Sequence, residues 1–471
     1  MPHTRLLGAA RTVAAVTLFL PAALTSQDST QTDSTHHHRH RKWNEVPAFD
    51  QTKPLPFAFA DFTWVNGNTR AHISPLDTKY FTPEIRVDVN FVDDFNHPSD
   101  HTLDGAAEMG RTSEFQVQQF GIGGDFHYDN VRARLMTQFG MYSTETPRDD
   151  ASPARGQFQL ADAYRYVSEA YGGYHFDVMN GINVDAGIFL SYIGLFSYYN
   201  ADNWAYQPSY VSANTPWFFN GIRVQTFPSQ KLKVELWLIN GWQSYGSFQN
   251  QPGVGTQILW RPNGSIQALS NDYEGYDTFG APHRLRIHSD NSFLLKYYDS
   301  PNSFWDKSAF SFTFDIGCET GSGVRCINSK GGIPAQQFVG FMLYDRNWFL
   351  HDHFGITVGG GAIDNPGRYL VLLPPINGAT AASGTPYFTT NPGDQYHAWD
   401  FSVSLDWAPN DYFMVRVEPD HRAASVPYFV GPGGITPAGG NTGLAGSFVP
   451  GFQPDLRKSE TRINFAMLVK L

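Results

Sequence analysis

The sequence has only two cysteines, few charged residues and no long hydrophobic run after its N-terminal residues. Beyond residue 26, no run of about 18 or more apolar residues occurs, which excludes a transmembrane helix from that part of the chain. The net charge of −11 excludes a protein that binds nucleic acid through a basic surface, because such binding needs clustered Lys and Arg. No nucleophile elbow and no phosphate-binding loop are present, so we predict neither an enzyme nor a cofactor.

Aromatic residues, by contrast, are abundant. They make up 15% of the 471 residues, close to the 16% that are charged, and 44 Gly and 30 Pro accompany them. Aromatic side chains favour strands, and Gly and Pro favour turns. The mean hydropathy of −0.34 is compatible with a membrane barrel, because only alternate residues of a barrel strand contact lipid. The composition therefore predicts an all-β protein.

The first residues and the two cysteines are both typical of an exported protein. Arg5 and Arg11 accompany an apolar run at 12–20, which is too short to cross a bilayer as a helix, and small residues follow it. We therefore expect residues 1–26 to be a cleaved signal peptide. Cys318 and Cys326 flank a Gly-rich loop, and such a pair in an exported protein predicts a disulfide rather than a metal site.

Two short segments are expected to precede the barrel. Residues 27–56 are polar and carry a His-rich cluster, His36–His40, which is interpreted as part of a disordered periplasmic leader; the alternative is a weak transition-metal site. Residues 57–79 are predicted to be a periplasmic or lumen-associated segment. Together they are too short for a plug domain, which argues against a high-affinity active importer.

From residue 80 to 471, apolar and polar residues alternate along long segments. In residues 84–91, Ile85, Val87, Val89 and Phe91 share one side of a strand while the residues between them are charged or polar. Strands are predicted at 80–92, 114–127, 130–142, 160–176, 181–191, 217–228, 231–243, 253–261, 264–273, 285–298, 306–318, 335–348, 352–362, 396–407, 411–421 and 459–471.

The connections between these strands alternate between tight turns and long loops. Turns such as 128–130 and 228–230 alternate with loops such as 192–216 and 422–458. This is how a transmembrane barrel is built, with short periplasmic turns and long external loops. Because an unpaired amide in lipid costs several kcal/mol, the sheet must close. We therefore predict an antiparallel up-and-down barrel of about sixteen strands, which is wide enough to enclose water.

The polar side of the predicted strands is expected to line the lumen. It carries charges of both signs, and rings of charge set which solutes pass a channel; the alternative is that the charges only pair with one another on a wet wall. The candidate wall residues are Arg86, Arg132, Arg134, Arg165, Glu169, Arg223, Lys233, Glu235, Arg286, Asp400, Arg416, Glu418 and Arg462.

The third external loop, residues 192–216, is strongly aromatic and nearly uncharged. Such a loop would be poorly solvated outside the barrel, so we expect it to fold inward and narrow the channel; the alternative is packing on the rim or at a subunit contact. Its candidate constriction residues are Tyr199, Asp202, Asn203, Trp204 and Tyr206. A second motif, His351-Asp352-His353, is interpreted as a solvated turn rather than a metal site.

Several segments resemble the β-barrel porin-2 (OmpL-like) family of bacterial outer-membrane proteins. They are Glu169–Tyr174, Asp185–Phe189 with Tyr192-Ile193-Gly194, Tyr210–Arg223 and Asn240–Gln243. The resemblance covers roughly residues 81–471. It implies an outer-membrane barrel that transports small hydrophilic solutes, and it implies no catalytic residues. One departure is the C-terminus, which ends in Leu471 where many outer-membrane proteins end in Phe.

These observations lead to one expected function and two alternatives. We expect a porin that allows passive diffusion of small hydrophilic solutes, sugars or ions, in the bacterial outer membrane. Its expected partners are outer-membrane lipid and these solutes, with no nucleic acid, and it is either a homotrimer or a monomer. The alternatives are a binding or adhesion barrel that acts through its external loops and, less favoured, a barrel enzyme.

Overall fold

The computed structural model describes most of the chain from residue 55 onward. The described residues are 55–104, 109–150, 152, 156–247, 251–278, 280–328, 330–331, 335–365, 369, 374–380, 383 and 396–471. The predicted signal peptide, nearly all of the predicted leader and its His36–His40 cluster lie outside this range.

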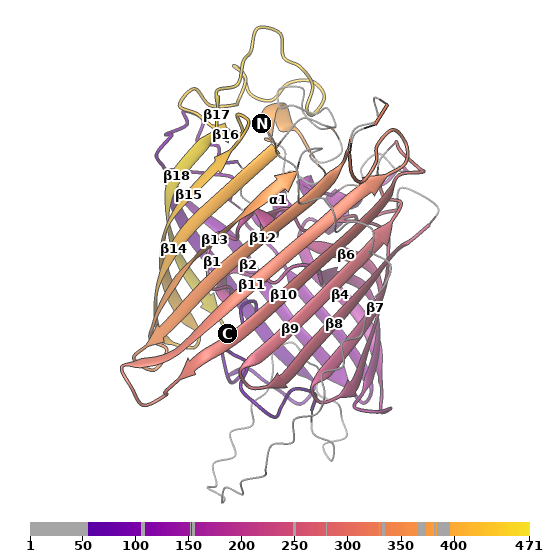
Figure 1. Ribbon diagram of the computed structural model, residues 1–471, viewed down its shortest axis with the longest axis vertical. Helices are drawn as coiled ribbons and strands as arrows, with labels where there is room; N and C mark the ends of the chain where they lie inside the picture. Colours follow the sequence, from indigo (N-terminus) through magenta and orange to yellow (C-terminus); the bar gives the residue numbers. More distant parts are fainter. Residues whose placement is uncertain are drawn as a thin grey trace, which may run out of the picture. The chain divides into compact units, whose positions relative to one another are not determined.

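Sixteen antiparallel strands form one closed barrel (Figure 1). The strands of the barrel are β1 (Phe81–Asp94), β2 (Phe115–Tyr128), β3 (Val131–Thr137), β4 (Val167–Phe176), β5 (Ile182–Leu190), β6 (Phe218–Ser229), β7 (Leu232–Ile239), β8 (Gly253–Asn263), β9 (Ile266–Gly275), β10 (Leu285–Asp299), β11 (Trp305–Thr320), β12 (Gln337–Phe349), β13 (Phe354–Asn365), β14 (Tyr396–Asn410), β15 (Phe413–Ala424) and β18 (Ser459–Lys470). Each pairs with the next along the chain, and β18 closes the sheet on β1. The predicted sixteen-stranded up-and-down barrel is confirmed.

The remaining elements are short and lie in the connections between barrel strands. They are α1 (Tyr142–Arg148), α2 (Leu160–Tyr164), α3 (Tyr210–Ala213), the 3-10 turns η1 (Asn200–Asp202) and η2 (Ile376–Gly378), and the strand pair β16 (Phe429–Val430) and β17 (Leu456–Arg457). Within the described residues, no helix is long and apolar enough to cross a bilayer. Cys318 and Cys326 form a disulfide at the outer end of β11, with their Cα atoms 4.9 Å apart.

The connection between β3 and β4 differs from the prediction. The strand predicted at 130–142 ends at Thr137, and the strand predicted at 160–176 begins only at Val167, because α1 and α2 occupy part of the intervening chain. Residues 160–164 contain Leu160, Ala161 and Ala163, which are strong helix formers, and they form α2 instead of the start of a strand. Arg165 therefore does not lie on the barrel wall. It follows α2, is 43% exposed and pairs with Asp162.

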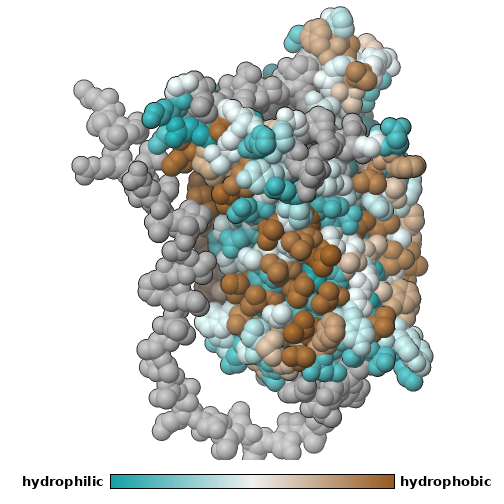
Figure 2. Space-filling model, turned by 90° about the vertical axis from the view of Figure 1, so that its right-hand side faces the viewer, coloured by the Kyte–Doolittle hydropathy of each residue, from teal (hydrophilic) through white to brown (hydrophobic). Residues whose placement is uncertain are grey.

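The strands expose apolar side chains and bury polar ones, which is the reverse of a soluble protein. On β14, Trp399, Phe401 and Leu405 are 47–49% exposed, whereas Asp400 and Asp406 on the opposite face of the strand are 7% exposed or less. Apolar side chains gather on the flank of the barrel (Figure 2). Alternating faces put one set toward the lipid and the other toward the lumen. The burial pattern therefore assigns the outside of the barrel to lipid.

Candidate functional site

The inward-facing charges are buried and paired rather than spread along an open water-filled wall. Arg86, Arg132, Arg134, Glu169, Glu235, Arg286, Asp400, Arg416, Glu418 and Arg462 all lie on barrel strands and are buried, and Arg223 and Lys233 lie there partly exposed. A barrel of sixteen strands is too wide for its own side chains to fill. Polypeptide must therefore occupy part of the lumen, and among the described residues two segments contribute most visibly to this filling.

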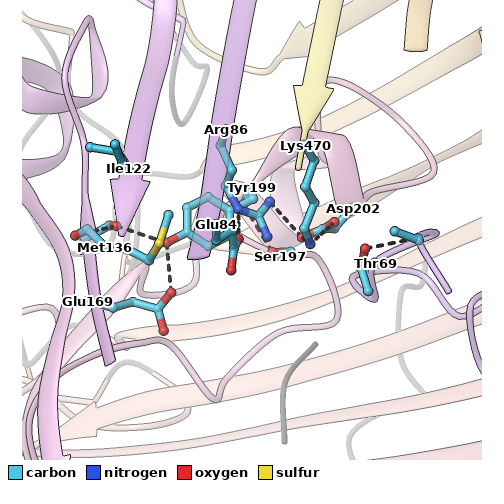
Figure 3. Close-up of polar contacts among 12 residues, drawn as sticks. Thr69, Glu84, Arg86, Ile122, Met136, Glu169, Ser197, Tyr199, Asp202 and Lys470 are labelled. Carbon is cyan, nitrogen blue, oxygen red and sulfur yellow. Dashed lines mark hydrogen bonds and ion pairs between the residues drawn. The ribbon is translucent and has the colours of Figure 1, made fainter. Parts of the chain in front are cut away.

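The first of these segments is loop 3 (residues 191–217), which connects β5 to β6. Asp202 of this loop forms ion pairs with Arg86 of β1 at 2.9 Å and with Lys470 of the neighbouring strand β18 at 3.0 Å. The Arg86 guanidinium also lies over the Tyr199 ring, 3.8 Å from its centroid, and the Tyr199 hydroxyl donates to Glu169 at 2.8 Å. Figure 3 shows these groups converging at the base of β1 and β18. These contacts fix residues 199–202 of loop 3 to the wall.

The middle of loop 3 is held by wall charges that bond to its main chain. Arg416 donates to the carbonyl of Asn203 at 2.7 Å, and Arg346 donates to that of Trp204 at 3.2 Å. Asp406 bridges the two guanidinium groups, at 2.6 Å from each. Irregular backbone is tolerated at membrane depth only where protein or water satisfies its polar groups. Arg416 and Arg346, held by Asp406, therefore satisfy carbonyl groups of loop 3 that no regular secondary structure satisfies.

Carboxylates of β14 and β15 accept from the following main-chain amides. Glu418 accepts from the amides of Tyr206 and Gln207 at 2.6 and 2.7 Å. Asp400 accepts from the amide of Tyr210 at 2.8 Å. Residues 200–210 are thus bound to β1, β18, β15, β14 and β12. These strands lie on one side of the barrel, where only β13, between β14 and β12, interrupts the series.

The second segment inside the barrel is residues 57–73, which we call the N-terminal strap. Its ends contact turns on opposite sides of the short-turn rim. The Phe57 amide donates to the carbonyl of Gln230 at 2.8 Å, between β6 and β7, and Arg70 donates to that of Asn410 at 2.9 Å, between β14 and β15. Between these ends, the Trp64 indole donates to the carbonyl of Gly264 at 3.0 Å. The strap therefore crosses the mouth of the barrel.

Loop 3 rests on the strap at the centre of this crossing. The Trp204 amide donates to Asn66 Oδ1 at 2.7 Å, its indole donates to the Trp64 carbonyl at 3.0 Å, and the Gly67 amide donates to the carbonyl of Asp202 at 3.0 Å. Trp64 and Val65 are each 1% exposed and belong to the same apolar cluster as Trp204. The sequence offered one signal of this role, the density of aromatic residues at 57–64 ahead of the first strand.

Free space remains on the other side of loop 3. A cavity of about 290 Å³ is bounded by loop 3, by strap residues 66–68 and by the wall from β1 to β9. Its charged lining residues are Arg86, Asp125, Arg134, Glu169, Asp202, Arg223, Lys233, Glu235 and Arg261. A smaller cavity of about 50 Å³ lies across the strap, beside β12 and β15. The larger cavity joins both signs of charge with aromatic and amide groups, which suits a polar solute.

The described residues contain no group of three His, Cys, Asp or Glu side chains that could hold a metal ion. The motif His351-Asp352-His353 lies in the turn between β12 and β13, where Asp352 pairs with Lys307 at 2.6 Å.

One loop carboxyl outside the barrel wall gives a pH dependence. Glu145 in α1 is buried and accepts from Gln118 at 2.9 Å. Burial raises its pKa from 4.5 to about 8, against the opposing effect of Arg148. The folded form holds the proton on Glu145 more tightly than an unfolded loop would. The stabilising effect of the protonated carboxyl is therefore complete at low pH and is lost as the pH rises from about 4.5 to about 8.

We therefore expect α1 to become more accessible as the pH rises. Limited proteolysis between residues 138 and 166 should accelerate from pH 6 to 8 in the wild type. In Glu145→Gln that acceleration should disappear, whereas dependence below pH 6 should persist because burial also raises the pKa of Asp149 to about 6. An unchanged slope between pH 6 and 8 in Glu145→Gln would contradict this assignment.

The sequence places this barrel among known proteins. Residues 84–450 match the family described as "Putative beta-barrel porin-2, OmpL-like". The chain belongs to this family. It is therefore a porin-type barrel of the outer membrane, and its family favours a channel over an enzyme. Comparison with the curated proteins finds no match.

Three solved structures of bacterial proteins are also similar to this porin. The anion-selective porin from Comamonas acidovorans shares 10% identity, with a TM-score of 0.46 over 83% of this chain and 99% of that one. OprB of Pseudomonas putida shares 10% identity, with a TM-score of 0.46 over 83% and 94%. DcaP of Acinetobacter baumannii shares 10% identity, with a TM-score of 0.46 over 85% and 100%. At such low similarity, none of them informs the role of a residue here.

Proposed function

We propose that this porin lets small hydrophilic solutes diffuse passively across the outer membrane, along a path between loop 3 and the wall of β2 to β9. The observation that carries the proposal is the one-sided attachment of the middle of loop 3, residues 200–210. This part is bonded to β1, β12, β14, β15 and β18, and a polar cavity lies on its opposite side. Among the preceding residues, Tyr192 and Tyr199 bond to the wall on the cavity side, at β8, β9 and β4. Loop 3 is then the constriction, and Arg223 and Lys233, the partly exposed cations of the lining, face the passing solute.

The lining fits solutes that are polar without a strong net charge. Arg134 is shared among Glu84, Asp125 and Glu169, each at 2.9 Å, and Arg223 pairs with Asp185 at 2.7 Å. Because the guanidinium groups are neutralised in place, the path presents alternating local charges rather than a field of one sign. Sugars and small zwitterions match such a path better than multivalent ions do.

Channel activity is testable on the purified protein in planar bilayers and liposomes. We expect stable conductance steps, and liposome swelling in solutions of small neutral sugars. Phe196 of loop 3 lines the large cavity, so Phe196→Ala should widen the path and raise the conductance of each open step. Phe448→Ala is the matched control, because Phe448 is 59% exposed in the loop between β15 and β18.

The results separate the channel from the alternatives. If the wild type and both variants stay silent, a binding or adhesion barrel replaces the channel as the best interpretation. If Phe196→Ala and Phe448→Ala conduct equally, loop 3 is not the constriction. We also propose that residues 1–26 are removed on export, which the N-terminal sequence of the mature protein would test.

A further inference from the structure

We propose that the N-terminal strap is a displaceable gate, so that solute passes only when residues 57–73 leave the short-turn mouth of the barrel. This inference rests on the proposed channel function and adds a closed state to it.

The strap lies between the two cavities. The larger cavity is lined by Asn66 and Gly67, and the smaller one by Thr63 and Val65. Asn68 and Asp202 line both cavities, so the strap and the part of loop 3 around Asp202 form the partition between them. A solute that enters from the long-loop side therefore reaches the strap before it reaches the mouth.

The attachment of the strap differs in kind from that of the barrel strands. A wall strand such as β1 is paired along nearly its whole length on both edges, with β2 and with β18. Among the described residues, the strap pairs with no strand. Isolated hydrogen bonds join it to the short turns, at Gln230, Gly264 and Asn410 and through the side chains of Asp411 and Tyr412. The bonds to loop 3 described above and buried aromatic side chains complete its attachment. Such a segment can detach while every strand pairing of the barrel stays intact.

The surface beneath the strap is compatible with water after detachment. The Arg261 guanidinium lies 5.0 Å from the Phe57 ring centroid and 4.4 Å from that of Phe62. The Lys296 ammonium lies 5.9 Å from the Trp64 ring centroid. Cations can exchange an aromatic face for hydration. Removal of the strap would thus expose charged groups as well as apolar wall.

Gly67 offers a way to weaken the closed state. It has a φ of +81°, which side chains rarely adopt, and a Cβ there would lie 2.7 Å from the carbonyl oxygen of Leu195 in loop 3. Both the backbone conformation and the contact oppose a larger residue. Gly67→Ala should therefore push the strap away from loop 3 and raise the fraction of time that the channel is open. The readout is the fraction of open time, because Gly67 also lines the larger cavity and the size of the open step can change with it.

A disulfide between positions 60 and 264 offers a way to lock the strap in the closed state. A Cβ built on Gly264 lies 3.0 Å from the Cβ of Ala60, so a small shift brings the pair to the separation of a disulfide. In liposome swelling, oxidised Ala60→Cys/Gly264→Cys should lose most of the wild-type flux, and reduction should restore it. The controls are the two single variants and the wild type under the same reductant, which also reduces Cys318–Cys326.

The outcomes separate the gate from the channel. If the wild type conducts and the oxidised double variant conducts equally, the strap does not move and the gate is refuted while the channel stands. An unchanged fraction of open time in Gly67→Ala would also refute the gate. A silent wild type with a conducting Gly67→Ala variant supports it. Silence of every variant would overturn the channel, and the gate with it.

Discussion

Asp406→Ala is expected to lower the free energy of unfolding of the barrel by about 3–5 kcal/mol, since it leaves two buried guanidinium groups without their carboxylate. Asp406 lies 2.6 Å from both Arg416 and Arg346, and all three side chains are 8% exposed or less. The loss should be measured as the shift of the urea unfolding transition in detergent or lipid. It should be accompanied by a looser loop 3, because both arginines bond to its carbonyls.

A matched control exists at the outer end of the neighbouring strand. Asp364 pairs with His397 at 3.0 Å, but the two side chains are 56% and 47% exposed. Asp364→Ala should cost no more than about 1 kcal/mol, as for other exposed ion pairs. A second variant isolates the cause: replacing Arg346 and Arg416 by Met together with Asp406→Leu should recover much of the stability, because no unpaired charge remains. Equal losses in Asp406→Ala and Asp364→Ala would contradict the buried-charge explanation.

Val403→Arg is expected to cost about 2–4 kcal/mol of barrel stability, because it places a cation in the middle of the lipid-facing surface. Val403 lies at the centre of β14, between the outward-facing Phe401 and Leu405. The effect should be read from the unfolding free energy in lipid vesicles. Val131→Arg is the control, because Val131 begins β3 at the short-turn rim, where the same change should cost about 0–1 kcal/mol.

The two variants distinguish lipid from water outside the barrel. A depth-dependent cost supports a lipid-facing surface. If Val403→Arg and Val131→Arg unfold at the same urea concentration, the outward face does not lie in a bilayer. Ser404 would be a poor control, since its hydroxyl donates to Glu418 inside the filled lumen and the site has no room for a larger side chain.

The barrel itself was predictable from the sequence, because each part of its signal is local. Alternation such as Ile85, Val87 and Val89 fixes which side of a strand faces lipid, and tight turns such as 128–130 fix where strands reverse. The prediction for residues 138–166 was wrong because this region has no clear alternation. Leu160–Tyr164 forms a short helix there, and Arg165 was therefore misplaced on the barrel wall.

The contents of the lumen were only partly predictable. Alternation puts Arg416 and Asp406 on the inner side, but it does not reveal whether they meet water or polypeptide. Arg416 donates to the main-chain carbonyl of Asn203, more than 200 residues distant, which no local pattern encodes. The aromatic character of loop 3 indicated that it folds inward. That the strap lies beneath it depends on contacts such as Trp64 with Trp204, between segments far apart in the chain.

The bonds between wall charges and loop 3 divide the inner surface into two parts with different freedom to change. On β12, β14 and β15, the charged residues Arg346, Asp400 and Glu418 bond to the loop backbone. A substitution that removes one of these charges therefore lowers the stability of the protein in addition to any effect on transport. Arg223 and Lys233 instead pair with carboxylates of the wall, Asp185 and Glu235, and these ion pairs do not involve the loop backbone. Adaptation to a new nutrient should therefore proceed through β6 and β7, while the opposite arc stays as it is.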